Sequence, residues 1–338
     1  MGIFSFQARP YCIFYDFYGF CHQWNGEWIR QYYKMREFSV TILGSSAALP
    51  YKNRNLTAQL VNHAGRSFLI DCGEGTQMQL TRLKLKGMRI GHIFISHLHG
   101  DHFYGLIGLI STFHLLGRKD DLHIYGPPDL EIILKMQLEA SMTTLVYRMF
   151  FHPTQSDFPE IIYEDDGLTI TTLPMVHRVP TTGFLFAEKQ YPRHINMEAA
   201  EMLNVPYTSF SDLKLGLDYT ASDGAIIHNS DLTFEPGKPR SYACCSDTLF
   251  HEPLADIISG CNLMYHEATF MNAMAEVAVA KMHSTAADAA RVAEKAGAGK
   301  LIIGHFSARY ENLLPLLEEA RAVFQESYLA EEGNVFQV

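Results

Sequence analysis

Short runs typical of β-strands follow one another along most of the chain, and in the first of them apolar and polar residues alternate. The first, residues 36–43, precedes a Gly-Ser-Ser turn and is typical of a β-strand. Similar strand-like runs occur at 57–61, 67–71, 92–96, 122–125, 168–173, 182–187, 242–245, 262–266 and 300–303. Apolar residues spaced three and four apart predict helices at 103–116, 128–138, 285–296 and 313–328. Hairpins followed by strands that alternate with helices predict an α/β fold of two sheets packed face to face, with helices outside.

Two segments depart from this pattern. Residues 1–34 contain twelve aromatic residues and both tryptophans of the chain. We interpret them as an N-terminal extension, either ahead of a natural start at Met35 or forming an arm that packs on the domain or on a partner. Residues 189–239 contain four prolines and few strand signals, which predicts an insertion projecting from the domain that spans residues 35–338.

Composition narrows the class of protein. The chain has 338 residues, 47% of them hydrophobic, with a formal net charge of −10. No apolar run reaches the roughly 18 residues that cross a bilayer, so we expect no membrane span. Six cysteines without regular spacing favour a reducing, cytoplasmic location over a disulfide framework. The acidic balance argues against indiscriminate binding of nucleic acid, although a local basic patch can still bind phosphates.

The strongest local signal is a run of potential metal ligands directly after a predicted strand. Residues 91–96 are mainly apolar and lead into His97, His99, Asp101 and His102. Because residues two apart on an extended chain point to the same side, His97 and His99 face one way. Neutral imidazoles with a carboxylate suit zinc, and manganese or iron accept similar ligands. This spacing predicts a metal site rather than a solvated polar loop.

Three further candidate ligands stand at the ends of strand-like runs. They are His177 after 168–173, Asp247 after 242–245 and His305 after 300–303. Taken singly, each is more often a helix cap or a surface residue. Together with the cluster they complete two metal sites, one formed by His97, His99 and His177 and the other by Asp101, His102 and His305, with Asp247 between them.

At this point the chain resembles the metallo-β-lactamase fold and, within it, the ribonuclease Z family of tRNA 3′ endonucleases. The motifs shared with the wider fold lie at 44–50, 52–55, 71–77, 97–102, 177–180 and 246–248. The motifs similar to ribonuclease Z itself are His266-Glu267-Ala268-Thr269-Phe270, His283-Ser284-Thr285-Ala286 and His305-Phe306-Ser307-Ala308-Arg309-Tyr310. The resemblance covers the chain from about Met35 to its C-terminus.

The resemblance implies a four-layer αβ/βα metallo-β-lactamase sandwich with a protruding arm, and two zinc ions per subunit. It gives Asp101 a proton-handling role and His283 the protonation or stabilisation of the leaving 3′ oxygen. It implies precursor tRNA as substrate, a 3′-hydroxyl on the tRNA, a 5′-phosphate on the trailer, a homodimer and no nucleotide cofactor. The segment 189–239 corresponds to an arm that clasps the tRNA elbow, but the family's Gly-Pro is absent after Pro206 and basic residues are sparse.

Other residues are expected to support the site or to bind RNA. Asp71 is suited to orient a ligand imidazole, and the strand-end pair His266 and Glu267 suits a supporting rather than a catalytic role. The candidate RNA contacts are Arg54, Lys84, Lys86, Arg89 and Arg309. For Arg54 and the basic stretch at 84–89, a solvated surface is an equally good interpretation.

Two alternatives to a tRNA endonuclease remain. The acidic charge and the irregular arm fit a dizinc hydrolase of small phosphodiesters or esters. A non-catalytic RNA-binding module would be expected to have lost ligands, whereas all seven are present.

Overall fold

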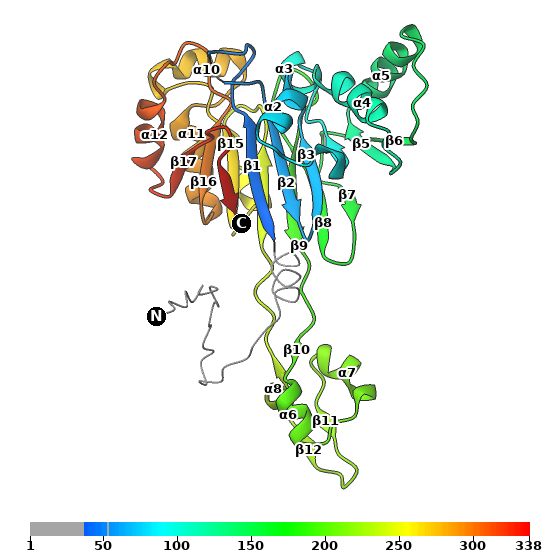
Figure 1. Cartoon of the computed structure of the whole chain (residues 1–338). Helices are drawn as coiled ribbons and strands as arrows, with labels where there is room; N and C mark the ends of the chain where they lie inside the picture. The colour runs from blue at the N-terminus through cyan, green and yellow to red at the C-terminus, as the bar shows by residue number, and fades with distance from the viewer. Residues whose placement is uncertain (1–36, 53) are drawn as a thin grey trace, which may run out of the picture.

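Two mixed seven-stranded sheets pack face to face, and helices cover both outer faces (Figure 1). The computed structural model describes residues 37–52 and 54–338, so the predicted extension at 1–34 lies outside the described residues. The arrangement is the four-layer αβ/βα sandwich with a protruding arm, which confirms the predicted fold class.

The first sheet has the strand order β18-β1-β2-β3-β4-β5-β6. In that order the strands are Val335–Gln337, Phe38–Gly44, Ala58–His63, Arg66–Ile70, Ile90–Phe94, Leu122–Gly126 and Met149–Pro153. The second sheet has the order β17-β16-β15-β14-β9-β8-β7. Its strands are Ser327–Leu329, Leu301–Gly304, Leu263–Glu267, Ser241–Cys245, Thr182–Glu188, Leu168–Pro174 and Ile161–Glu164. Strands β3 to β6 run parallel, as do β14 to β17, so in each group the carboxyl ends meet at one edge.

Helices flank each sheet. The first sheet is accompanied by α2 (Thr76–Arg82), η1 (Gly87–Arg89), α3 (Gly100–Phe103), α4 (Leu106–Leu115) and α5 (Asp129–Ala140). The second is accompanied by α9 (Leu254–Ile257), η3 (Asn272–Met274), α10 (Ala275–Lys281), α11 (Ala286–Ala296) and α12 (Leu314–Arg321). None of the described helices is long and apolar enough to cross a membrane.

Alternation along the strands explains the two apolar layers. In β3, Phe68 and Ile70 face the second sheet, whereas Leu69 faces the helices. Phe68 packs against Phe186 of β9 with ring centroids 5.8 Å apart, joining the sheets. Because both faces of the central strands are buried, these strands appear in the sequence as nearly continuous apolar runs.

The predicted boundaries of two helices were wrong. The stretch 103–116 divides into α3 and α4, because the Gly105 N–H donates to the Cys72 carbonyl (2.9 Å). A Cβ at Gly105 would lie 2.1 Å from the Gly73 carbonyl oxygen, so this close approach requires glycine. The helix predicted at 313–328 stops at Arg321. Residues Ser327–Leu329 form β17 instead, which pairs in parallel with β16. Pairing with the sheet overrides the local helical spacing.

The arm, residues 189–239, leaves the body after β9 and returns to β14. It contains β10 (His194–Ile195), α6 (Met197–Met202), η2 (Tyr207–Ser209), α7 (Phe210–Lys214), β11 (Tyr219–Thr220), β12 (Ile226–Ile227), α8 (Asn229–Leu232) and β13 (Thr233–Phe234). A small apolar cluster of Ala200, Val205, Leu213 and Leu232 holds these elements together. Figure 1 shows the arm projecting away from the body on two extended segments.

Candidate metal centre

The seven predicted ligands lie together at one end of the two sheets. His97 and His99 follow β4, Asp101 and His102 lie in α3, His177 follows β8, Asp247 follows β14 and His305 follows β16. The parallel strands of both sheets deliver their carboxyl ends to this edge, where side chains from segments far apart in the sequence converge. The structure therefore brings every one of these residues into a single site.

Three imidazoles form the first group. His99 Nδ1 lies 3.0 Å from His97 Nε2 and 3.3 Å from His177 Nε2. The Asp247 Oδ2 atom lies 3.7 Å from His97 Nε2 and 3.8 Å from His177 Nε2. One ligand atom from each of these four residues fits within 4.8 Å of all the others.

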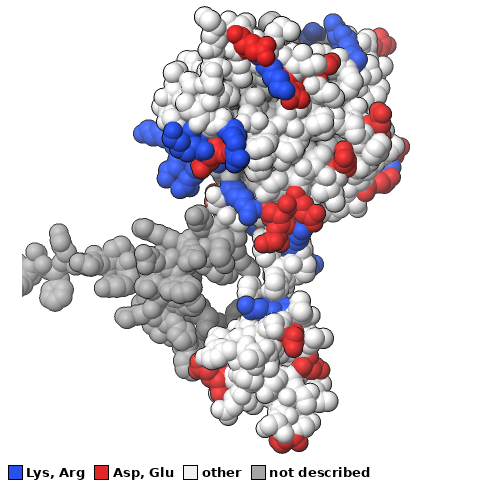
Figure 2. All heavy atoms as spheres, turned by 90° about the vertical axis from the view of Figure 1, so that its right-hand side faces the viewer, with Lys and Arg blue, Asp and Glu red and all other residues white. Residues whose placement is uncertain are grey.

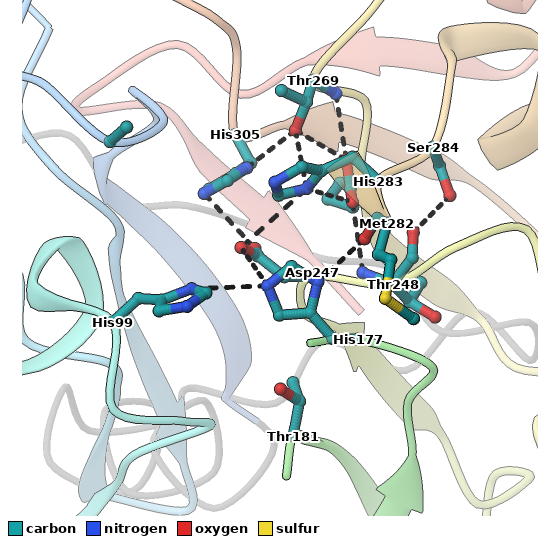
Figure 3. A network of polar contacts seen from close by, with 12 residues as sticks. His99, His177, Thr181, Asp247, Thr248, Thr269, Met282, His283, Ser284 and His305 are labelled. Carbon is teal, nitrogen blue, oxygen red and sulfur yellow. Dashed lines mark hydrogen bonds and ion pairs between the residues drawn. The ribbon is translucent and has the colours of Figure 1, made fainter. Parts of the chain in front are cut away.

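The second group lies on the other side of Asp247. Asp101 Oδ2 is 3.6 Å from His102 Nε2 and 3.3 Å from His305 Nε2, and the two imidazole nitrogens are 3.3 Å apart. The Asp247 Oδ1 atom lies 3.4 Å from His102 Nε2 and 3.3 Å from His305 Nε2. Each oxygen of Asp247 thus faces one group, as a carboxylate between two cations does. Figure 3 shows His99, His177, His283 and His305 arranged around Asp247.

The donor set fits divalent cations. Asp247 is 2% exposed, and its buried Oδ1 accepts no hydrogen bond from a described residue. Burying such an oxygen among imidazole nitrogens is costly unless a cation occupies the space between them. Nitrogen and carboxylate ligands suit zinc and similar ions. The clusters are metal-binding, which confirms that part of the sequence prediction.

Hydrogen bonds behind the imidazoles select the nitrogen that faces the site. His102 donates from Nδ1 to Asp71 (2.8 Å), and His177 donates from Nδ1 to the Met282 carbonyl (2.8 Å). In both rings Nε2 is left with its lone pair toward the ligand cluster. Asp71 therefore lies where the sequence placed it, behind a ligand histidine.

The backbone and the charges around the ligands are unusual. Asp71 and His305 have φ of 56° and 57°, in the left-handed region that residues other than glycine rarely adopt. Burial lowers the pKa of His97 well below its usual value, so this imidazole is held neutral and ready to ligate. Burial also opposes the charged form of His102, but Asp247 and Asp71 raise its pKa.

A second carboxylate, Glu267, holds His283 and Thr269 beside the ligand cluster. His283 donates from Nδ1 to Glu267 Oε1 (2.7 Å), and the Thr269 hydroxyl donates to Glu267 Oε2 (2.7 Å). The same hydroxyl lies 2.9 Å from His305 Nδ1 and can accept a hydrogen bond from its N–H, which leaves the lone pair of His305 Nε2 facing the ligands. Burial favours neutral His283, yet Glu267 raises the pKa of His283 to about 9.

An open cleft of about 660 Å³ gives access to these groups. Its lining includes His99, Asp101, Asp247, His283 and His305. Two further lining residues, Tyr104 and Thr269, were not singled out from the sequence. Thr269 lies inside the His-Glu-Ala-Thr-Phe motif, which could have indicated it. Tyr104 follows the ligand cluster in sequence, but only the fold shows that its 65%-exposed side chain borders the cleft.

The remaining predicted residues are distributed over the molecule. His266 neighbours Glu267 on β15 and therefore points to the opposite face, where it is fully buried. Arg54 donates to the Tyr310 carbonyl (2.9 Å) and packs over the Tyr51 ring, which suits holding a loop more than meeting a phosphate. Arg309 is exposed beside the cleft and donates to the Ser307 hydroxyl (3.1 Å).

The basic stretch does not lie at the metal centre. Lys84, Lys86 and Arg89 are exposed and precede β4, whose carboxyl end carries the ligands. Arg89 directly precedes β4 and therefore lies at the end of the first sheet from which β4 starts, opposite the cleft, and none of the three residues lines the cleft. Their closeness in sequence to His97 does not make them neighbours in space.

Known proteins similar to this chain share its length and fold. Residues 38–252 match the family model described as Anti-Pycsar protein Apyc1. Ribonuclease Z of Bacteroides fragilis is 48% identical over 301 residues, covering 88% of this chain and 98% of that protein. Ribonuclease Z of Porphyromonas gingivalis is 44% identical over 298 residues, with the same coverage of both. The crystal structure of human tRNase Z, short form, superposes with a TM-score of 0.64 at 27% identity, covering 89% of this chain and 99% of that one.

Proposed function

The chain belongs to the ribonuclease Z family of metallo-β-lactamase-fold proteins, and from that premise we propose that it removes the 3′ trailer from precursor tRNA. Its products are a tRNA with a 3′-hydroxyl and a trailer with a 5′-phosphate. The Apyc1 family model ends at residue 252, before Glu267, His283 and His305, whereas the ribonuclease Z relatives at 46–48% identity cover 88% of the chain.

The observation that carries this proposal is the ligand cluster with Asp247 between its two halves. Two divalent cations, which we propose are zinc, would neutralise the phosphodiester and supply an activated water when bound there. Asp101 is placed to ligate and to accept a hydrogen bond from the activated water, because its Oδ2 atom faces the cluster, held there by the Ala48 N–H that it accepts (2.7 Å). Burial opposes its ionisation, but His305 and His102 lower the pKa of Asp101 and keep it ionised.

We assign His283 the protonation of the leaving 3′ oxygen. Its Nδ1 is engaged by Glu267, so Nε2 is the nitrogen available to the cleft that His283 lines. Despite burial, Glu267 raises the pKa of His283 to about 9, which favours the protonated ring at neutral pH. An imidazolium beside the departing oxygen is a competent general acid.

The arm lies at the opposite end of the body from the metal centre. It departs where β9 ends at Glu188, whereas the ligands stand where β9 begins. A seven-residue strand spans about 23 Å, so the arm of one subunit is directed away from its own cleft. We propose that in a homodimer the arm of one subunit holds the tRNA that the other cuts.

Exposed apolar side chains supply a face for the second copy. Leu115 of α4 is 81% exposed, and Ile132 and Met136 of α5 are 58% and 63% exposed. Residues three to four positions apart share one side of a helix, so Ile132 and Met136 form a continuous apolar strip. We propose that this strip forms part of the subunit interface.

The distribution of Lys and Arg suggests where the protein would contact RNA. The arm contains four Lys or Arg against seven Asp or Glu, and Figure 2 shows blue side chains gathered on the body while most of the arm is white or red. We propose that Lys84, Lys86 and Arg89 hold phosphates at the arm end of the body, and that Arg309 meets the scissile phosphate at the cleft. We also propose a cytoplasmic location, which the free thiols of Cys72, Cys244, Cys245 and Cys261 support.

The test is cleavage of a trailer-bearing precursor tRNA by zinc-loaded protein, with the ends of both products mapped. We expect a single cut that yields the stated termini, and loss of that cut in Asp101→Ala. An intact trailer at enzyme excess would refute the endonuclease. Turnover of small diesters that tRNA does not inhibit would favour the small-substrate hydrolase instead.

A further inference from the structure

The arm joins the body through a neck of two extended segments, residues 189–193 and 235–239. The β9–β14 ladder pairs Ala187 with Ser241, and one more hydrogen bond follows, from Glu188 N to the Arg240 carbonyl (2.9 Å). Pairing resumes in the arm only at β10 and β13, where His194 faces Phe234. Prolines at 192, 236 and 239 have no N–H to donate across the neck. The direction of the arm therefore depends on what fixes the two ends of the neck.

The body end of the neck is fixed by the carboxylate of Glu188. Its Oε2 atom accepts the Arg240 backbone N–H (2.9 Å) and the Arg240 Nε–H (3.0 Å). Its Oε1 atom accepts from Arg240 Nη2 (2.6 Å) and lies 3.1 Å from His63 Nε2 and 3.3 Å from the Tyr191 hydroxyl. One side chain thus contacts the outgoing segment at Tyr191, the returning segment at Arg240 and the first sheet at His63.

The contacts are buried and directional. The Glu188 and His63 side chains are 1% and 2% exposed. Arg240 presents its planar fork to both carboxylate oxygens and stacks over Phe38 of β1 at 5.4 Å. A bidentate pair of this kind sets orientation as well as distance. Removing one partner of a buried pair leaves the other uncompensated, so the arrangement is not easily replaced by water.

A second carboxylate beside the neck offers a contrast. Glu164 pairs with Lys189 (2.6 Å), but the two side chains are 56% and 34% exposed. Exposed pairs contribute little because solvent screens them and their side chains stay mobile. Glu164 also contacts only the outgoing segment. It is therefore a matched control for a carboxylate at the neck.

We propose that Glu188 is a positioning residue for the substrate: it holds the arm in the direction from which the arm meets full-length precursor tRNA, without touching the reacting atoms. This inference rests on the proposed function. It assigns the specificity for a complete tRNA in part to a buried carboxylate at the far end of β9 from the metal centre. Loosening the neck spreads the arm over many directions, and each added direction that does not meet the tRNA lowers the fraction of molecules that can bind.

The kinetic test compares Glu188→Gln and Glu164→Gln on two substrates, full-length precursor tRNA and bis(p-nitrophenyl) phosphate. For Glu188→Gln we expect KM for precursor tRNA to rise about tenfold, kcat to stay within about twofold, and turnover of the small diester to be unchanged. Glu164→Gln should match the wild type throughout. The KM of a variant in which a glycine-serine linker replaces residues 190–238 gives the largest increase that complete loss of the arm can cause.

A distance measurement tests the same inference without RNA. Spin labels at Met202 in the arm and Lys119 in the body, diluted with unlabelled protein, should give a narrow distance distribution in the wild type and a broad one in Glu188→Gln. If Glu188→Gln folds poorly, Arg240→Lys keeps the charge, loses the fork and should show the same broadening and KM effect.

Each result has a defined meaning. An unchanged KM and an unchanged distribution would overturn the positioning role, and so would an equal loss on both substrates, which would place the effect in the fold or the metal centre. If the wild type fails to cut any precursor tRNA, the proposed function is refuted, while the distance distribution still decides whether Glu188 holds the arm.

Discussion

Replacing Asp71 with asparagine should weaken metal binding although Asp71 is not one of the candidate ligands. The Asp71 carboxylate is 2% exposed and accepts three hydrogen bonds, from the Ser96 N–H (2.8 Å), the Ser96 hydroxyl (3.0 Å) and His102 Nδ1 (2.8 Å). An amide offers one oxygen and one NH₂. If the oxygen continues to accept from the Ser96 N–H, the NH₂ faces His102 Nδ1, which must then accept a hydrogen bond rather than donate one.

The consequence is a change of tautomer. With Nδ1 accepting, His102 carries its hydrogen on Nε2, the atom that lies 3.3 Å from His305 Nε2 and faces the ligand cluster. A protonated Nε2 has no lone pair for a metal. Loss of a partner that orients a ligand histidine typically lowers metal affinity by about 10- to 100-fold, or about 1.4 to 2.7 kcal/mol.

The assay is titration of metal-free protein with zinc in competition with a chelating indicator. Thermal unfolding with and without zinc gives a second measure, because the stabilisation by bound metal should fall by the same free energy. Asp121→Asn is the control, since it removes a carboxylate from an exposed pair with Arg148. If zinc affinity of Asp71→Asn stays within about twofold of the wild type, the orienting role is refuted; if only the metal-free protein is destabilised, Asp71 acts through packing.

Three further predictions concern activity and stability. His283→Gln should lower kcat for precursor tRNA by about 100-fold with the zinc content unchanged by elemental analysis; a parallel loss of zinc would contradict the general-acid role. Dialysis against a chelator should abolish cleavage and added zinc should restore it, and cleavage that survives complete metal removal would contradict a metal-dependent reaction. Burial opposes the ionised form of Glu188, but His63 and Arg240 lower the pKa of Glu188 to about 2. This value lies below the pKa of about 4.3 that a glutamate has in the unfolded chain. The ionised Glu188 therefore stabilises the folded protein fully above about pH 4.5, and this contribution is lost as the pH falls toward 2. Acid unfolding followed by circular dichroism should therefore cost the wild type more stability over that range than Glu188→Gln, and equal losses would contradict the shift.

The sequence predicted the strands and the ligands better than it predicted the helices and the RNA contacts. Strands buried on both faces leave long apolar runs, and a ligand must directly follow a strand to reach the site, so both leave local signals. The end of the 313–328 stretch left no such signal, because the pairing of β17 with β16 depends on a partner about 25 residues away. Thr269 was missed for a similar reason: its hydroxyl matters only because the fold brings Glu267 and His305 to it.

The residue types and spacing of His97, His99, Asp101 and His102 by themselves predicted a metal-binding cluster after the fourth long strand, because few other chemistries need such a group of ligands. The motifs at 266–270, 283–286 and 305–310 carried the resemblance to the ribonuclease Z family, which the relatives confirm. Only the tertiary structure decided which end of the body each group occupies. It turned the two oxygens of Asp247 toward different histidines, tied Arg54 to the Tyr310 carbonyl, and put Arg89 and the arm at the end opposite the cleft. The physical reason is that a strand carries neighbouring residues in the chain to opposite ends of a sheet, while parallel strands gather distant residues at one edge.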